Sequence, residues 1–271
     1  MQVPGQNHRD PWFAPWFTQI LKDTKYIFRT TEGTPFLFPG TGTGGWEAAL
    51  TNTLSPGDKV VCFRYGQFSH LWIDMMQRLG LDVQIVDCPW GEGADEGILE
   101  DILKKDTAKK IKAVCVVHNE TTTGVTRDIA GCRQAMDSAK HPALLMVDGV
   151  SSIGALDFRM DEWRVDVAVT GSQKALSLPT GLAVVAASPK VRTCQAGFIT
   201  GHNHGWIATC SHCVTRSVHC IQHMTKCLPS YYCRWHNTAH LAELEQLGLA
   251  PCTPVQPLSM QHPTQHSVRY P

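Results

Sequence analysis

The sequence has no excess of charge of either sign and no long apolar run. Its 271 residues include 24 Lys and Arg and 24 Asp and Glu, so the formal net charge is zero. Such a chain has no general electrostatic attraction to nucleic acid or to a membrane surface. Its apolar runs are shorter than the roughly 20 residues that span a bilayer, and residues 1–16 lack the apolar core of a signal peptide. Neither nucleic acid nor a membrane is therefore expected as a partner.

Cysteine is scarce through the first 190 residues and abundant after them. The first part holds only Cys62, Cys88, Cys115 and Cys132. Three of these lie in or beside predicted strands, where a reduced cysteine acts as a small hydrophobic side chain, so we expect a reducing compartment. Residues 191–271 hold the other seven of the eleven cysteines and nine of the thirteen histidines, but no aspartate. This shift in composition predicts a domain boundary near residue 190.

Apolar strands alternate with helical patterns in residues 1–190. Asp10 and Pro11 predict the start of a helix, with a capping acid before a proline at the first helical position. The apolar face of this helix is expected to consist of Trp12, Trp16, Ile20 and Ile27. Further helices are predicted at about 43–54, 69–79, 96–105 and 128–140, and strands at 59–64, 82–87, 111–117, 143–147, 166–170 and 182–187.

Near-continuous apolar strands separated by helices are typical of a mostly parallel sheet covered by helices on both faces. The predicted fold class is therefore α/β, with residues 1–190 as its large domain. Sites in such sheets lie beyond the carboxyl ends of the strands. Candidate functional residues are sought where strands end.

Two neighbouring strands end in residues of complementary chemistry. The run ALLMV ends on Asp148, and the strand of DVAVTGSQKALSLPTG leads to Lys174. Taken alone, each has an ordinary interpretation, because an aspartate after a strand is often a cap and a lysine is usually a solvated surface charge. Lys174, however, lies among uncharged and apolar neighbours, where loss of solvation makes an amine nucleophilic. Together they match the needs of pyridoxal phosphate, whose aldehyde forms an imine with a lysine and whose ring nitrogen pairs with a carboxylate.

A glycine-rich loop, PGTGTGGWE at 39–47, precedes a predicted helix. Glycine lets the backbone approach a phosphate, Thr41 and Thr43 offer hydroxyl groups, and the helix N-terminus adds a positive dipole end. The same loop could be only a tight strand–helix turn. It lacks the Lys-Ser/Thr ending of a nucleotide-binding loop and fits the dinucleotide pattern poorly, so a single phosphate is the expected ligand.

Two further segments follow strands on the same side. Phe68 could lie flat on a cofactor ring, and Thr121, in HNETTTG, could donate a hydrogen bond to the cofactor. Core packing is an equally ordinary role for Phe68, as local turn bonding is for Thr121. Trp46 and Trp72 are interpreted as core residues.

Together these segments make residues 10–188 resemble the class V aminotransferases, which have the fold-type I architecture, with the closest resemblance to plant and algal serine–glyoxylate and alanine–glyoxylate enzymes. The resemblance rests on long motifs in a conserved order. They are GTPFLFPGTGTGGWEAALTNTLSPGDKVV, GQFSHLWIDMMQRLG, HNETTTGVT, LMVDGVSSIGALDFRMDEW and VTGSQKALSLPTG.

The resemblance implies a pyridoxal 5′-phosphate enzyme that transfers an amino group by a ping-pong mechanism from serine or alanine to glyoxylate, which becomes glycine. Lys174 would be the Schiff-base lysine and proton shuttle, and Asp148 would pair with the ring nitrogen. Small amino acids and 2-oxo acids are the implied partners, with a homodimer as the assembly and the peroxisome, or else the mitochondrion, as the location. The remaining implied cofactor contacts are Thr41, Gly42 and Thr43 at the phosphate with Gln173 beside them, Phe68 on the ring, and Thr121 at the ring hydroxyl or the phosphate.

Residues 191–271 match nothing in the resemblance. Members of the family carry an arginine in a C-terminal domain that binds the substrate carboxylate, and no arginine of this segment is assigned that role. The sequence also ends Arg269-Tyr270-Pro271 rather than in a peroxisomal tripeptide. We expect the C-terminal domain to be missing or replaced by an aberrant tail, and the chain could then bind the cofactor yet be catalytically impaired.

A zinc module in the tail is a remote alternative. Cys210 and Cys213 are followed by His219 and His223, but the five residues between the pairs are too few for the hairpin and helix of a zinc finger. Pairing the cysteines with His236 and His240 leaves a gap of 22 residues instead. No metal site is therefore predicted.

Overall fold

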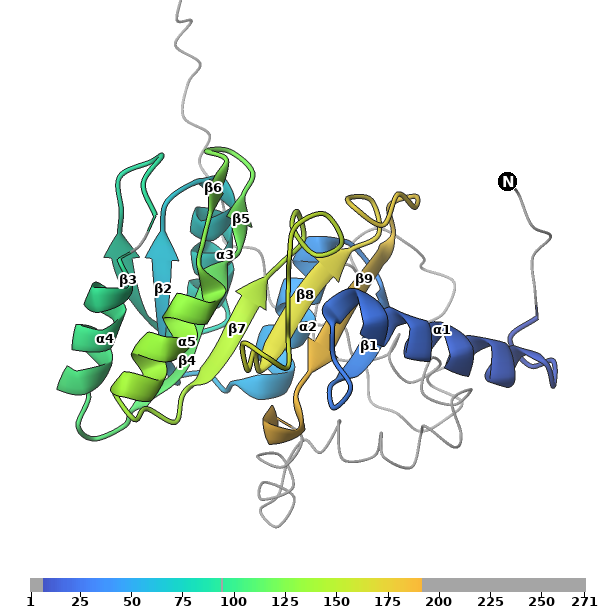
Figure 1. Cartoon of the computed structure of the whole chain (residues 1–271), viewed down its shortest axis with the longest axis horizontal. Coiled ribbons are helices and arrows are strands. Elements are labelled where there is room, and N and C mark those ends of the chain that lie inside the picture. The colour runs from blue at the N-terminus through green and yellow to red at the C-terminus, as the bar shows by residue number, and fades with distance from the viewer. Residues whose placement is uncertain (1–6, 94, 192–271) are drawn as a thin grey trace, which may run out of the picture. The chain divides into compact units, whose positions relative to one another are not determined.

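The computed structural model describes residues 7–93 and 95–191 (Figure 1). The predicted tail, with its cysteine and histidine pairs, lies outside the described residues. The helices are α1 (Phe13–Phe28), α2 (Gly42–Thr53), α3 (Gln67–Arg78), α4 (Glu96–Lys105) and α5 (Ile129–Ser138). The strands are β1 (Thr34–Pro39), β2 (Lys59–Arg64), β3 (Asp82–Asp87), β4 (Ile111–Val117), β5 (Asn119–Glu120), β6 (Val125–Thr126), β7 (Leu144–Asp148), β8 (Val167–Gly171) and β9 (Leu182–Ala187).

Seven of these strands form one mixed sheet in the order β1-β9-β8-β7-β4-β2-β3. Strands β8, β7, β4, β2 and β3 are parallel, whereas β9 is antiparallel to both β8 and β1. Two antiparallel pairings in succession make β1 run in the same direction as β8. The carboxyl ends of β1, β8, β7, β4 and β2 therefore lie along one edge of the sheet. The prediction of a mostly parallel sheet is confirmed.

Helices cover both faces of the sheet, as predicted. In Figure 1, α4 and α5 lie in front of the strands, and α2 and α3 lie behind them. The two pairs of helices lie on opposite faces because the chain moves along the sheet in both directions. Right-handed crossovers in one direction place their helices on one face, and right-handed crossovers in the reverse direction place theirs on the other. Helix α2 packs on β8 and β9, and α3 packs on β2 and β3. The two directions diverge between β2 and β4, and ligand sites in such sheets lie beyond the carboxyl ends of the strands.

The core lies between the sheet and these helices. The central strands carry almost continuous apolar residues, as parallel strands covered on both faces require, and every residue of β8 is buried. Cys62, Cys115 and Cys132 are buried thiols within this core. The interpretation of Trp46 and Trp72 as core residues is confirmed, since both are buried and their rings stack at 5.8 Å between centroids.

The first helix was predicted wrongly in two respects. It begins at Phe13 rather than at Pro11, and no side chain caps it. Asp10 lies in the preceding turn, where its carbonyl oxygen accepts a hydrogen bond from the Phe13 N–H. The expected apolar face also fails, because Trp12 and Trp16 are exposed, and the only buried residues of α1 are Thr24 and Phe28. None of the described helices is long and apolar enough to cross a bilayer.

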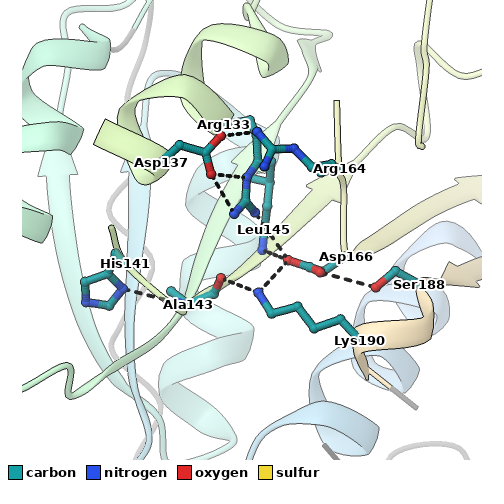
Figure 2. Close-up of polar contacts among 9 residues, drawn as sticks. All are labelled: Arg133, Asp137, His141, Ala143, Leu145, Arg164, Asp166, Ser188 and Lys190. Atoms are coloured by element: carbon teal, nitrogen blue, oxygen red, sulfur yellow. Dashed lines mark hydrogen bonds and ion pairs between the residues drawn. The ribbon is translucent and has the colours of Figure 1, made fainter. Parts of the chain in front are cut away.

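The opposite edge of the sheet is held by a polar network around Asp166 (Figure 2). This aspartate precedes β8 and is 4% exposed. Its Oδ2 accepts a hydrogen bond from the Leu145 N–H at 2.8 Å and lies 3.4 Å from Lys190 Nζ and 3.7 Å from Arg133 Nη1. Its Oδ1 accepts a hydrogen bond from the Ser188 hydroxyl at 3.2 Å. The network joins the beginnings of β7 and β8 to the end of β9.

Candidate active site

The predicted cofactor residues follow strands that end at one edge of the sheet. Asp148 is the last residue of β7, and Lys174 lies in the turn that follows β8. Strand β1 leads directly to α2, and the Gly40 N–H donates to the Gly181 carbonyl at 2.9 Å, which joins the loop before α2 to the loop after Lys174. The structure thus brings three of the predicted segments to neighbouring strand ends.

The Asp148 carboxyl is buried, with 4% of the residue exposed. Burial raises its pKa to about 6, because desolvation penalises the charged form. The Val150 N–H, which donates to Asp148 Oδ1 at 2.9 Å, partly opposes this rise, as does the Trp46 indole, although the indole makes no hydrogen bond of normal geometry. Of the nearby charges, Glu120 raises this pKa and Lys174 lowers it. A buried carboxyl of this kind is well suited to accept a hydrogen bond from a protonated ring nitrogen.

Lys174 does not lie in the apolar surroundings expected from the sequence. Its side chain is exposed, so the expected loss of solvation is wrong for the described residues. The error arose because sequence neighbours were taken as spatial neighbours, whereas residues 172–181 form a turn at the strand end in which Leu178 is also exposed. The lysine amine remains accessible to a ligand at this edge.

The N-terminus of α2 provides the expected phosphate cradle. Thr41 is the N-cap, and its hydroxyl accepts a long hydrogen bond, 3.4 Å, from the Gly44 N–H. Thr41 and Thr43 are exposed, while Gly42 is buried. A Cβ added at Gly42 would lie 2.8 Å from Val150 Cγ2, so any larger residue would push the helix N-terminus away from the residues that follow Asp148. Free first-turn N–H groups and the helix dipole favour an anion here.

Several buried polar atoms at this edge have no partner within the described chain. They belong to three of the five such residues in the described parts: Thr170 Oγ1, near the end of β8, Gln173 Oε1 and Trp46 Nε1. Buried polar groups in native proteins are almost always hydrogen-bonded, so an unpartnered cluster at one place needs an explanation. A polar ligand at the edge would supply the missing partners.

Phe68 and Thr121 lie on the β4–β2 side of the same edge. Phe68 is half-buried in the first turn of α3, directly after β2. Thr121 is exposed in the turn between β5 and β6. Among the described residues, the Thr121 hydroxyl forms no hydrogen bond with the other predicted site residues. The structure therefore places Thr121 on the expected edge without a hydrogen bond to any of them in the described part of the chain.

Sequence reasoning missed two buried polar residues that follow β4. His118 is 3% exposed, and its Nδ1 lies 2.9 Å from the Ser152 hydroxyl. Burial lowers its pKa to about 4, so the imidazole is neutral near pH 7. Glu120 is completely buried. Both residues stand in the motif HNETTTG, but only Thr121 was singled out, although a lone acid among uncharged residues was a signal for Glu120.

These features fit pyridoxal 5′-phosphate. The edge offers a buried carboxyl for the ring nitrogen, an accessible amine for the aldehyde, and a helix N-terminus for the phosphate. It also offers the unpartnered hydroxyl of Thr170 and amide of Gln173 as further polar contacts.

Comparison with known proteins agrees with this arrangement. The family model for class V aminotransferases matches residues 13–201. The chain is 62% identical over 190 residues to a serine–glyoxylate aminotransferase of Arabidopsis thaliana, covering 70% of this chain and 47% of that protein. It is 58% identical over 190 residues to an L-aspartate–glyoxylate aminotransferase of Paracoccus denitrificans, covering 70% and 48%. The crystal structure of ureidoglycine–glyoxylate aminotransferase from Bacillus subtilis superposes with a TM-score of 0.66 at 31% identity, covering 71% and 48%.

The fold is therefore that of the large domain of a fold-type I pyridoxal phosphate enzyme. Within that class, the chain belongs to the class V aminotransferase family, and pyridoxal 5′-phosphate is the cofactor that this membership implies. The chain spans about half the length of the curated relatives it matches.

Proposed function

We propose that this chain binds pyridoxal 5′-phosphate and takes part in transamination from serine or alanine to glyoxylate, giving glycine. The observation that carries the proposal is the placement of Asp148 and Lys174 after adjacent strands, β7 and β8, beside the N-terminus of α2. The names of the relatives support glyoxylate as the acceptor, and they differ in the amino donor, which is serine in one and L-aspartate in another.

Each of the described site residues has its own role in the proposed reaction. Asp148 would keep the ring nitrogen protonated by pairing its carboxylate with the N–H of that nitrogen, and its burial strengthens the pairing. When bound, the cofactor supplies an electron-withdrawing ring that stabilises negative charge on the substrate carbon. Lys174 holds the cofactor through its amine and then moves a proton at the substrate carbon.

The other proposed contacts fix the position of the cofactor. Thr41, Gly42 and Thr43 bind the phosphate through the hydroxyls and first-turn N–H groups of α2. Gln173 adds an amide contact beside Lys174, and the aromatic ring of Phe68 packs on the cofactor ring. Thr121 contributes a hydroxyl from the turn after β5. Holding the ring at both ends leaves less freedom to lose when the substrate binds.

Spectroscopy of the purified full chain with added pyridoxal phosphate tests this proposal. Binding through Lys174 gives a visible absorbance band, which serine should bleach and glyoxylate should restore. A band that serine leaves unchanged would indicate a cofactor-binding chain that is catalytically impaired. A chain without any band would contradict the proposal.

Two lysine variants give matched controls. Lys174→Ala should remove the band completely. Lys105→Ala, at the exposed last turn of α4, should leave it unchanged. Loss of the band in both variants would mean that the colour does not report attachment at Lys174.

A homodimer and a peroxisomal location extend the proposal. Both rest on the resemblance to the family rather than on contacts in the described residues. Size-exclusion chromatography with light scattering of the cofactor-loaded chain measures the assembly, and a monomer at micromolar concentration would contradict the dimer. Localisation of the tagged chain by microscopy tests the compartment.

A further inference from the structure

Helix α3 cannot cap its own N-terminus. Its N-cap residue is Gly66, which has no side chain to accept a hydrogen bond from the first-turn N–H groups. A larger residue is excluded, because a Cβ at Gly66 would lie 2.3 Å from Glu120 Cγ and 2.7 Å from Thr122 Oγ1. The close approach of the β5–β6 segment thus both requires glycine and brings other groups to the helix end.

The carboxylate of Glu120 takes the place of the missing cap. Its Oε1 accepts from the Phe68 N–H at 3.3 Å, and its Oε2 accepts from the Ser69 N–H at 3.0 Å. The neighbouring Thr122 hydroxyl donates to Oε1 at 2.9 Å and accepts from the Gln67 N–H at 3.0 Å. All three of these first-turn N–H groups are therefore held by the segment that follows β4, and a negative charge lies at the positive end of the helix dipole.

This capping carboxylate is also tied to the edge that carries Asp148. The residue before it, Asn119, donates from Nδ2 to the Ser151 hydroxyl at 2.9 Å, and that hydroxyl donates to the Asn119 carbonyl at 2.7 Å. The His118 N–H donates to the Asp148 carbonyl at 2.8 Å. Glu120 is near enough to Asp148 to raise the pKa of that carboxyl. A chain of short bonds thus connects the first turn of α3 to the end of β7.

We propose that Glu120 is a positioning residue for the cofactor, which it serves by fixing the first turn of α3 and with it the ring of Phe68. The inference rests on the proposed function, because Phe68 is given its role there. Glu120 itself touches no reacting atom in this proposal. A completely buried carboxylate would otherwise be a costly way to cap a helix, since an exposed serine or aspartate achieves the same.

The affinity of the full chain for pyridoxal phosphate, measured by absorbance titration, tests the inference. Glu120→Gln keeps the size of the side chain but puts N–H groups where only acceptors fit, so the first turn of α3 should shift. We expect binding to weaken by about tenfold, which corresponds to about 1.4 kcal/mol. The visible circular dichroism of the bound cofactor should change as well, because it reports the asymmetric contact with Phe68.

A matched control separates positioning from simple capping. Asp128 caps α5 by accepting from the Gly131 N–H at 2.9 Å, and it is not one of the proposed cofactor contacts. Asp128→Ala should lower the unfolding temperature as a lost cap does, yet leave the affinity and the circular dichroism unchanged. If Glu120→Gln lowers only the unfolding temperature, as Asp128→Ala does, Glu120 is only a structural cap and the inference fails.

A double-mutant cycle with Phe68→Ala tests the route of the effect. If Glu120 acts through Phe68, the double variant binds about as weakly as Phe68→Ala alone. Additive losses would overturn the inference, because Glu120 would then act by another route. A wild-type chain that binds no cofactor overturns the proposed function and this inference together, whereas wild-type binding that Glu120→Gln leaves unchanged overturns only the inference.

A milder variant decides the matter if Glu120→Gln does not fold. Thr122→Val removes the hydroxyl that joins Glu120 to the Gln67 N–H but leaves the carboxylate in place. It should weaken binding in the same direction by a smaller factor, about threefold. Unchanged affinity in a folded Thr122→Val protein would count against the inference.

Discussion

Two buried aspartates at opposite edges of the same sheet have very different surroundings. Asp148 ends β7 and Asp166 precedes β8, and each is 4% exposed. Asp166 has Arg133 and Lys190 within 4 Å and accepts hydrogen bonds from the Leu145 N–H and the Ser188 hydroxyl (Figure 2). Asp148 accepts a hydrogen bond from the Val150 N–H, and its pKa is raised.

The difference separates a structural carboxylate from one that is suited to a ligand. The charge of Asp166 is compensated by the protein itself, so the edge that it holds is complete. The charge of Asp148 is compensated only in part, and buried polar atoms of Thr170 and Gln173 near it are also unpartnered. Burial alone does not mark a functional residue, whereas burial without compensation does.

The largest expected effect comes from breaking the compensated edge. Asp166→Ala removes the acceptor of the Leu145 N–H and the buried carboxylate beside Arg133 and Lys190, and should lower the free energy of unfolding by about 3–5 kcal/mol. Urea unfolding followed by circular dichroism measures this loss.

An exposed pair provides the control for that loss. Glu162→Gln removes an ion pair with Arg159 whose partners are 39% and 63% exposed, and should cost less than about 1 kcal/mol. A loss in Asp166→Ala as small as that of Glu162→Gln would mean that the network does not hold this edge.

Replacement of Asp148 by asparagine should change the free energy of unfolding in the opposite direction. The folded state raises its pKa from 3.8 to about 6, so keeping it ionised costs stability at all pH values above about 6. Asp148→Asn should therefore stabilise the cofactor-free chain by up to about 3 kcal/mol near pH 8, while it weakens cofactor binding. The unfolding free energy without cofactor, measured at that pH, decides the sign. A destabilised variant would mean that the described chain does compensate this carboxylate.

The pH dependence of stability sharpens the comparison further. The pKa of His118 is lowered from 6.5 to about 4, so its contribution to stability is lost as the pH falls through that range. The raised pKa of Asp148 acts in the opposite direction, because protonation relieves its burial cost as the pH falls from about 6 to 4. In the wild-type chain the two terms should nearly cancel between these pH values.

Asp148→Asn should uncover the contribution of His118. Its unfolding free energy should fall by about 2 kcal/mol more than that of the wild type between pH 6 and pH 4. Cofactor-free samples of both proteins, unfolded by urea at several pH values, provide the measurement. Parallel curves for the two proteins would contradict the prediction.

Much of the fold and of the candidate site could be predicted from the sequence, because the strands and helices have strong periodic patterns. The strands at 59–64, 82–87, 111–117 and 182–187 have the predicted bounds. The placement of Asp148 and Lys174 at neighbouring strand ends could be predicted because parallel strands bring their last residues to one edge. The sequence did not reveal β1 as a strand or its pairing with β9, since antiparallel pairing at a sheet edge leaves no distinct pattern in a short apolar run.

The parts that could not be predicted depend on contacts distant in the sequence. The capping of α3 by Glu120 joins residues 51 or 52 positions apart. The local sequence around either partner does not indicate that the two are in contact. The exposure of Lys174 and the poor burial of α1 were missed for a related reason. Local composition describes which residues are neighbours along the chain, whereas the fold decides which residues are neighbours in space.

The smallest expected change in the free energy of unfolding is that of Lys174→Ala, and a small change is informative. Because the side chain is exposed, Lys174→Ala should change the unfolding free energy of the cofactor-free chain by less than about 0.5 kcal/mol. The added stability that pyridoxal phosphate gives the wild type should nevertheless fall sharply in this variant, since covalent attachment is lost. Thermal unfolding with and without cofactor measures both quantities in one experiment. A large loss of stability without cofactor would mean that Lys174 packs within the fold, and the contrast with Asp166 would then no longer separate the two edges by function.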